Sequence, residues 1–381
     1  MEKGYILMIP SWYPNRENTH AGIFVKKHIQ IISQFIDCYT LFVLPTSKLR
    51  AFKIEVEKHP SSEIIYFGTA KSALLNTFLY FLINVIKISA VILKKGRPKF
   101  VHNHVVFPSG FVAVLVAKLL NVRLIISEHW SGYLIEDNRF KRLNTKIQQV
   151  IRYILSSAYK IGLVSNFMKD RLVESQLCTE DKVIITPNKI ELNNFVPIQR
   201  ELREEIKVLT ICNLNDFEKN ISGMIEAIQH LNQNESINIK LQIIGEGIDE
   251  VKLKKLASEY GLLNTKIFFL GKIENHLLTN YYRNSDFYIL NSNFETLNIS
   301  TIEALMHGLP VVASKCGGPQ DYLNQQNSIQ VNTKDTNDLV RGINEMIKHF
   351  SKYDRKIIKL EIEKLYNEKV VLESLRKLYA F

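Results

Sequence analysis

The feature that most constrains this chain is a repeated alternation of short apolar runs with longer amphipathic stretches. The apolar runs have the length of buried strands, and the stretches between them have the 3.6-residue period of helices. This rhythm predicts βαβ units around a parallel sheet. In the first half we expect strands at 5–9, 39–44, 100–103, 123–127 and 183–185, with helices at 22–35, 76–93 and 112–120.

The same rhythm starts again after a polar joint that contains Pro197. A second doubly wound α/β unit is therefore predicted behind the first. Here the expected strands are 208–212, 240–244, 267–270, 287–291 and 311–313, and the expected helices are 221–230, 251–260 and a Lys/Glu-rich helical segment over 336–379.

The length of 381 residues also favours two domains, at about 150 residues for each. In paired Rossmann-like domains the ligand lies at the carboxyl ends of the strands, in the cleft between the domains. The predicted division is a first Rossmann-like domain at 1–190, a linker at 191–203, a second Rossmann-like domain at 204–355, and a C-terminal helix at 356–381 that packs back toward the first domain.

Composition is that of a well-packed globular protein, with 46% hydrophobic and 23% charged residues. The four cysteines lie far apart without a C-x-x-C pair, so reduced thiols are expected and neither a zinc site nor a disulfide framework is indicated. The first apolar run, 5–9, is too short for the core of a signal peptide. We therefore expect the protein in the cytoplasm.

The net charge of +11 is concentrated in the first half of the chain. Residues 1–190 hold 26 Lys and Arg against 13 Asp and Glu, whereas the remainder is close to neutral. A basic field of this kind attracts anionic lipid headgroups, phosphorylated ligands or nucleic acid. A solvated basic surface without a dedicated partner is the alternative reading of the same charges.

The segment 73–93 consists of 21 mostly apolar residues and is long enough to span a membrane. Asn76, Asn84 and Lys87 argue against a span. A core helix is the first expectation, and a helix that docks on an anionic membrane surface, helped by the basic residues at 94–99, is the second.

The most informative stretch runs from Phe294 to Ala313, directly after an expected strand. We expect a helix over 300–305, with Glu295 in the loop before it and Glu303 in its first turn. A carboxylate in such a loop can accept the hydroxyls of a hexose, and one within the helix can accept those of a ribose. The alternative for Glu303 is a capping box with Ser300, in which it only closes the helix start.

The order of these residues resembles the signature of retaining glycosyltransferase family 4. Glu295 and Glu303 are followed by Gly308-Leu309-Pro310-Val311-Val312-Ala313 and then by Gly317-Gly318-Pro319. The resemblance implies the GT-B fold, in which two Rossmann-like domains face each other across a donor and acceptor cleft. It also implies transfer of a hexose-type sugar from a nucleotide-sugar, a UDP-sugar first and a GDP-sugar next, with retention of configuration.

The resemblance also assigns roles to residues outside this string. Glu295, Lys219 and His129 are the predicted catalytic residues, with Lys219 on the donor phosphate and His129 orienting the reacting sugar, whereas an isolated histidine or lysine is more often structural or simply solvated. The predicted donor-binding residues are Glu303, Glu295, Lys219, Gly245, Thr296, Leu297, Asn298, Ile299 and Asn213, and those on the acceptor side are Gly22, His102 and His104.

Two departures from the family pattern bear on activity. Asn213 stands where the family usually has Arg, and Thr296 and Asn298 stand where it usually has Gly. Loss of a guanidinium removes a bidentate contact to a diphosphate, so Lys219 and the backbone N–H groups at the helix start would carry more of the leaving group.

The predicted function is therefore a retaining glycosyltransferase of bacterial surface-polysaccharide synthesis, in the cytoplasm and peripherally on the inner face of the membrane. No D-x-D motif and no His/Cys ligand cluster is evident along the sequence, so neither a metal nor a cofactor is expected. The predicted partners are a nucleotide-sugar donor, a saccharide or polyprenyl-phosphate-linked acceptor and an anionic membrane surface, without nucleic acid.

Three alternative functions, two enzymatic and one of binding alone, fit the sequence less well. A nucleotide-sugar epimerase of the same fold would need the same carboxylates without an acceptor. An inactive glycosyltransferase-like binding subunit is suggested by Asn213. A dehydrogenase is disfavoured because no G-x-G-x-x-G follows the first strand.

Overall fold

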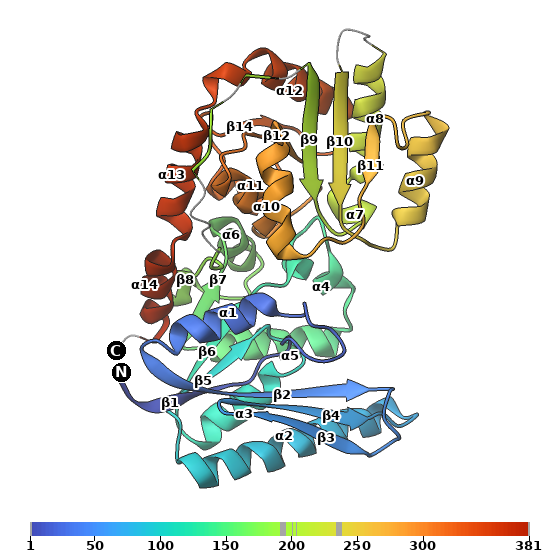
Figure 1. Ribbon diagram of the computed structural model, residues 1–381. Helices are drawn as coiled ribbons and strands as arrows, with labels where there is room; N and C mark the ends of the chain where they lie inside the picture. Colours follow the sequence, from blue (N-terminus) through green and yellow to red (C-terminus); the bar gives the residue numbers. More distant parts are fainter. Residues whose placement is uncertain (1, 191–195, 200, 203, 234–237, 380–381) are drawn as a thin grey trace. The chain divides into compact units, whose positions relative to one another are not determined.

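The computed structural model describes residues 2–190, 196–199, 201–202, 204–233 and 238–379 (Figure 1). The chain forms two compact α/β units, each built on its own sheet. Unit 1 comprises Met1–Tyr133, Asn138–Lys189 and Glu368–Phe381, and unit 2 comprises Leu134–Asp137 and Ile190–Asn367. Most of the predicted linker, 191–195 with 200 and 203, lies outside the described residues.

Unit 1 contains an eight-stranded sheet in the order β3-β4-β2-β1-β5-β6-β7-β8. All neighbouring strands are parallel except β3 and β4. The strand order reverses at β1, whose neighbours are β2 and β5. The strands are β1 (Glu2–Met8), β2 (Ile36–Thr46), β3 (Ile54–His59), β4 (Ser62–Gly68), β5 (Phe100–His104), β6 (Arg123–Glu128), β7 (Lys160–Leu163) and β8 (Val183–Ile185).

The helices of unit 1 alternate with its strands, as the sequence rhythm predicts. They begin at residues suited to capping, such as Ser165, whose side chain accepts a hydrogen bond from the backbone N–H of Met168. These helices are α1 (Ile23–Ile32), α2 (Ala73–Lys95), α3 (Gly110–Leu119), α4 (Arg139–Arg142), α5 (Thr145–Ser157), α6 (Asn166–Glu174) and α14 (Glu368–Tyr379).

Helix α2 is amphipathic across its 23 residues. It is long and apolar enough to cross a membrane by length and composition, and 28% of its most apolar window is buried. One face, including Tyr80 and Ile88, packs into unit 1, whereas Leu74 and Phe78 on the other face are 85% and 61% exposed. The expectation of a core helix therefore holds for one face only.

Helix α14 completes the core of unit 1, although it comes last in the chain. Val371, Leu375 and Leu378 are fully buried in a cluster that also contains Ile6 of β1, and the ring of Tyr379 lies 5.2 Å from that of Phe100. The predicted helical segment 336–379 is broken into three helices. The predicted boundary between 355 and 356 is wrong, because the chain enters unit 1 only at Glu368, after a helix that belongs to unit 2.

Unit 2 contains a six-stranded, wholly parallel sheet in the order β11-β10-β9-β12-β13-β14. Residues 287–290 and 311–314 form strands that are buried along their whole length, as expected for strands covered on both faces. The strands are β9 (Glu205–Ile211), β10 (Asn238–Ile244), β11 (Ile267–Phe269), β12 (Phe287–Leu290), β13 (Val311–Ser314) and β14 (Ser328–Val331).

The strand order of unit 2 reverses at β9, whose neighbours are β10 and β12. Ligands of open α/β sheets bind at such a reversal, outside the carboxyl ends of the strands. The helices of this unit are α7 (Asp216–Lys219), α8 (Ile221–Asn232), α9 (Glu250–Glu259), α10 (Asn275–Asn284), α11 (Ile299–Met306), α12 (Thr336–Lys348) and α13 (Arg355–Tyr366).

Candidate active site

The loop that carries Glu295 follows β12 and is pinned to the loop that follows β13. The backbone N–H of Glu295 donates to the carbonyl of Cys316 at 2.7 Å, and the N–H of Gly318 donates back to the carbonyl of Glu295 at 2.9 Å. A Cβ at Gly318 would lie 1.9 Å from the carbonyl oxygen of Thr296, so only glycine allows this approach. Residues 295–297 are therefore held at the carboxyl edge of the sheet.

Three hydrogen-bond donors meet at one oxygen of the Glu295 carboxylate. Oε1 accepts from Lys219 Nζ at 2.7 Å, from Ser292 Oγ at 2.8 Å and from Asn298 Nδ2 at 2.6 Å. No donor to Oε2 is found among the residues that the structure describes. Among the described residues the carboxylate is thus fixed through Oε1 alone.

Lys219 and Glu295 form a largely buried ion pair, with side chains 15% and 10% exposed. Burial alone would lower the pKa of Lys219, but the charge and the hydrogen bond of Glu295 outweigh it and raise that pKa above its usual range. The ammonium is therefore charged at neutral pH. A fixed cation at this edge suits a phosphate or another developing negative charge.

Asn298 begins helix α11 as its N-cap. Its Oδ1 accepts from the backbone N–H of Thr301 at 2.9 Å, while its amide holds Glu295. Asn298 adopts φ 63°, a left-handed conformation that asparagine tolerates better than most residues. The helix starts at Ile299, one residue earlier than predicted, and its first N–H groups have no partner within the helix.

This helix start excludes the capping box. Ser300 is the second helical residue and not the N-cap, so Glu303 lies in the second turn, beyond reach of the cap. Its Oε2 instead accepts from the hydroxyl of Tyr282 at 3.0 Å, and that hydroxyl also contacts the carbonyl of Ser300 at 3.2 Å. The placement of Glu303 in the first turn is therefore wrong, and its carboxylate is oriented by Tyr282 of α10.

Gly245 and Asn213 follow β10 and β9 at the same edge. Gly245 has φ 139°, and a Cβ there would lie 1.8 Å from the carbonyl oxygen of Cys212, so the two strand ends approach closely. Asn213 is exposed, and its Oδ1 lies 2.4 Å from where a Cβ of Gly247 would be. Backbone atoms therefore approach each other closely beside the end of β9. The side chain there is the amide of Asn213, where the family usually has the guanidinium of an arginine.

The predicted acceptor-side residues all lie in unit 1. Gly22 is the N-cap of α1 with φ 62°, and a Cβ there would come within 2.6 Å of the backbone of Trp12. His102 is buried with both ring nitrogens engaged, Nδ1 with the hydroxyl of Tyr379 at 2.7 Å and Nε2 with Ser127 Oγ at 2.9 Å. His104 ends β5 and is buried, and His129 follows β6. The orienting role of His129 stays a prediction.

Sequence reasoning missed several residues that these sites use. Ser292 and Tyr282 orient the two carboxylates, and no linear pattern connects them to Glu295 or Glu303. The buried carboxylate of Glu128 accepts from the backbone N–H groups of Val106, His129 and Trp130 and so fixes the loop that carries His129. Its position directly after the predicted strand 123–127 is a signal that the sequence does offer.

Comparison with known families covers most of the chain. Residues 46–194 match Glycosyltransferase Family 4, and residues 196–360 match Glycosyl transferases group 1. The second match contains Lys219, Gly245, Glu295 and Glu303. Among curated proteins, Protein CapJ of Staphylococcus aureus is 24% identical over 276 residues, which are 71% of this chain and 65% of CapJ.

Solved structures show the same architecture over the whole chain. The lipopolysaccharide outer core galactosyltransferase WaaB, in its apo form, has a TM-score of 0.74 at 18% identity and covers 98% of each chain. HepE of Anabaena in complex with UDP has a TM-score of 0.73 at 13% identity and covers 99% of each chain. With both halves matched by a family and the fold shared end to end, this chain belongs to the group 1 and family 4 glycosyltransferases and has the GT-B fold.

Proposed function

We propose that this protein transfers a hexose-type sugar from a nucleotide-sugar, a UDP-sugar in the first place, to a saccharide or polyprenyl-phosphate-linked acceptor, with retention of configuration. Membership of the family supports sugar transfer in polysaccharide or glycolipid synthesis. The complex of HepE with UDP supports UDP as the nucleotide part of the donor, since that protein shares the fold. The pathway proposed is assembly of a bacterial surface polysaccharide.

The observation that carries the proposal is the paired environment of Glu295 and Glu303 in unit 2. Each carboxylate is held by a neutral or cationic donor that fixes one of its oxygens, Lys219 for Glu295 and Tyr282 for Glu303. Glu295 lies before α11 and Glu303 in its second turn. We assign the hexose hydroxyls to Glu295 and the ribose hydroxyls to Glu303, because carboxylates accept such hydroxyls in pairs.

Lys219 and the start of α11 supply the positive charge for the departing nucleoside diphosphate. In the proposed step the acceptor oxygen bonds to the anomeric carbon as the bond from that carbon to the phosphate oxygen breaks. The acceptor's proton passes to the departing phosphate oxygen on the same face. Lys219 stabilises the charge that develops there, and no metal is assigned to the diphosphate.

The acceptor side of the proposal rests on unit 1. A cavity of about 740 Å³ lies beside α2 and β2, with an almost wholly apolar lining that includes Phe42, Tyr80, Phe81 and Phe111. The exposed apolar face of α2 is followed by Lys94 and Lys95. A basic, amphipathic helix beside an apolar cavity suits a lipid-linked acceptor presented at an anionic membrane surface.

The first experiment is a thermal-shift and calorimetric screen of UDP-, GDP- and ADP-sugars against wild type and Glu303→Ala. A ligand that binds only the folded state at 100 times its Kd stabilises it by about 2.7 kcal/mol. We expect one UDP-sugar to stabilise wild type and Glu303→Ala to lose that response. Glu259→Ala is the control, because Glu259 is an exposed carboxylate of the same unit.

Stabilisation by none of the donors, or an undiminished response of Glu303→Ala, overturns the proposed donor site. Product analysis with the stabilising donor then separates the activities. A new glycosidic bond with the donor's anomeric configuration supports retaining transfer, and an altered nucleotide-sugar without an acceptor indicates an epimerase. Binding without turnover indicates the inactive subunit that Asn213 suggests.

A further inference from the structure

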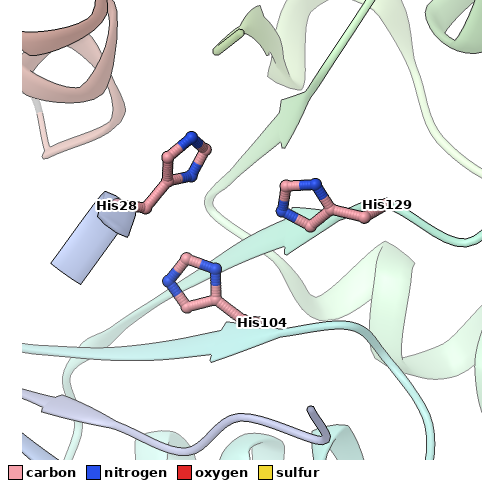
Figure 2. A group of neighbouring side chains, drawn as sticks. All are labelled: His28, His104 and His129. Carbon is pink, nitrogen blue, oxygen red and sulfur yellow. The ribbon is translucent and has the colours of Figure 1, made fainter. Parts of the chain in front are cut away.

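Three histidines from separate segments of unit 1 converge on one point (Figure 2). His28 comes from α1, His104 from the end of β5 and His129 from the residue after β6. Each offers one ring nitrogen, and these three atoms all lie within 4.8 Å of one another. The ring centroids are 5.6 Å apart for His28 and His129 and 6.1 Å apart for His28 and His104.

Five ring nitrogens of this group lack hydrogen-bond partners in the described part of the chain. These are both ring nitrogens of His104, both of His129, and Nδ1 of His28. Buried polar atoms are normally satisfied, so five such atoms in three neighbouring rings require an explanation. His102, which stacks on His104 at 4.2 Å, is no part of the group, because both of its nitrogens are engaged.

The hydrogen bonding of His28 fixes which nitrogen it offers. Its Nε2 lies 3.2 Å from the carbonyl oxygen of Pro187, which can only accept, so Nε2 carries the proton. Nδ1 is then a lone-pair donor, and Figure 2 shows this ring turned toward the other two. A histidine whose second nitrogen is bound to a backbone carbonyl is the usual arrangement of a metal ligand.

The chemistry of the facing atoms decides between a cation and an anion as the occupant. Because Nε2 of His28 carries the proton, its Nδ1 offers a lone pair and no N–H, and a lone pair binds a cation. His104 and His129 each place one ring nitrogen beside it, and a neutral imidazole has one nitrogen that can do the same.

We propose that His28, His104 and His129 form a binding site for one divalent transition-metal ion of the zinc class, with a fourth position open to water or an exogenous ligand. Three imidazoles suit zinc, cobalt and nickel better than magnesium or calcium, which prefer oxygen ligands. A tetrahedral ion 2.0–2.1 Å from each nitrogen separates the nitrogens by about 3.3 Å, so binding draws the three rings together.

The three histidines all lie in unit 1, whereas Lys219, Glu295 and Glu303, which we assign to the donor, lie in unit 2. The proposal therefore leaves the diphosphate to Lys219, and it gives His129 a ligand role in place of the predicted orienting role. It also replaces the expectation that the protein holds no metal, which rested on linear spacing alone.

The test uses the full chain, purified without a polyhistidine tag and stripped with a chelator. Calorimetric titration with ZnCl₂ should show one ion per chain, and CoCl₂ should produce the visible absorption of a low-coordinate cobalt–imidazole site. His28→Ala, His104→Ala and His129→Ala should each weaken zinc binding at least about 10-fold, by analogy with losses seen even for residues behind the ligands. His59→Ala is the control, because His59 is an exposed histidine of the same unit.

X-ray absorption of the wild-type zinc complex tests the ligand set without any variant, in case a substitution prevents folding. Three nitrogen neighbours at about 2.0–2.1 Å support the site. Absence of stoichiometric binding, a ligand shell dominated by oxygen or sulfur, or unchanged affinity in all three folded variants overturns it. None of these measurements uses a donor or an acceptor, so the result is independent of the proposed function.

Discussion

Lys219 and Glu295 join the end of α7 to the loop after β12 by a single contact of 2.7 Å within unit 2. Each partner acts on the other: the carboxylate of Glu295 keeps the ammonium of Lys219 charged, and the ammonium keeps the carboxylate oriented. Seventy-six positions separate the partners in sequence, so the folded sheet edge is what brings them together.

Lys219→Met should lower kcat by about 100- to 1000-fold, because it removes the cation assigned to the leaving diphosphate. It should also lower the free energy of unfolding by about 3 kcal/mol, since a buried carboxylate loses its charged partner. Steady-state kinetics and urea unfolding measure the two effects. Lys252→Met, at a lysine that is 71% exposed, should change neither, and full activity of Lys219→Met would remove Lys219 from the mechanism.

Asn298 can be tested with two substitutions that separate its backbone from its side chain. Asn298→Gly removes the cap and the bond to Glu295 but accepts φ 63° freely, whereas Asn298→Ala adds the cost of a left-handed alanine, about 1–2 kcal/mol. Both variants should lose donor affinity, and thermal unfolding should show the alanine variant as the less stable. Equal stability would mean that the backbone conformation costs nothing here.

Tyr282→Phe should weaken nucleotide-sugar binding about 10-fold while leaving kcat nearly unchanged. The hydroxyl that orients Glu303 is lost, and a hydrogen bond to a charged group contributes about 1.5 kcal/mol or more. Calorimetry with the donor measures the change. Tyr260→Phe, at an exposed tyrosine that directly follows α9, is the matched control. A fall in kcat without a change in affinity would place Tyr282 elsewhere in the reaction.

The exposed face of α2 provides a test of membrane docking. Replacing Leu74 and Phe78 by Glu should abolish co-sedimentation with vesicles that contain anionic lipid, because two large apolar side chains no longer enter the interface. Transfer to a water-soluble acceptor analogue should continue. Leu360→Glu, at a 55% exposed leucine of α13, should leave vesicle binding intact. Equal sedimentation of all variants would show that α2 does not dock.

Acid should destabilise the metal-stripped protein before most carboxylates titrate. Burial lowers the pKa of His28 from 6.5 to about 4, so between these values the unfolded chain binds a proton that the folded chain does not. The free energy of unfolding should therefore fall as the pH drops from about 6.5 to about 4. His28→Asn should flatten this slope in urea titrations at a series of pH values, and an unchanged slope would show that His28 does not contribute.

Much of the fold could be predicted because the strands that build both sheets are short, apolar and bounded by turn residues. The prediction of the strand 183–185 is exact to the residue, and Glu295 and Glu303 can be singled out as candidates because they lie in one continuous string. The β3–β4 hairpin was not predicted. Its first strand carries partly exposed Glu and Lys side chains and lacks the apolar run of a buried strand. It is held at the sheet edge by pairing with β4, which pairs in turn with β2.

The histidine cluster lay beyond sequence reasoning for a different reason. Its members are at positions 28, 104 and 129, and their spacing matches no ligand motif. They meet because β1 lies between β2 and β5, which places the helix after β1 beside the ends of β5 and β6. The sequence predicts separate roles for His104 and His129. It predicts none for His28, because nothing in the segment around His28 distinguishes it from a residue on a helix surface.

Helix α14 sets the order in which the protein can mature. Its residues Val371, Leu375 and Leu378 fill the same cluster as Ile6, yet the ribosome adds them after every residue of unit 2. While unit 2 is being synthesised, unit 1 lacks α14, so part of its apolar core stays uncovered. The core is completed only when the residues of α14 have been added. Synthesis halted before Glu368 would therefore damage the unit that was made first and leave unit 2 intact.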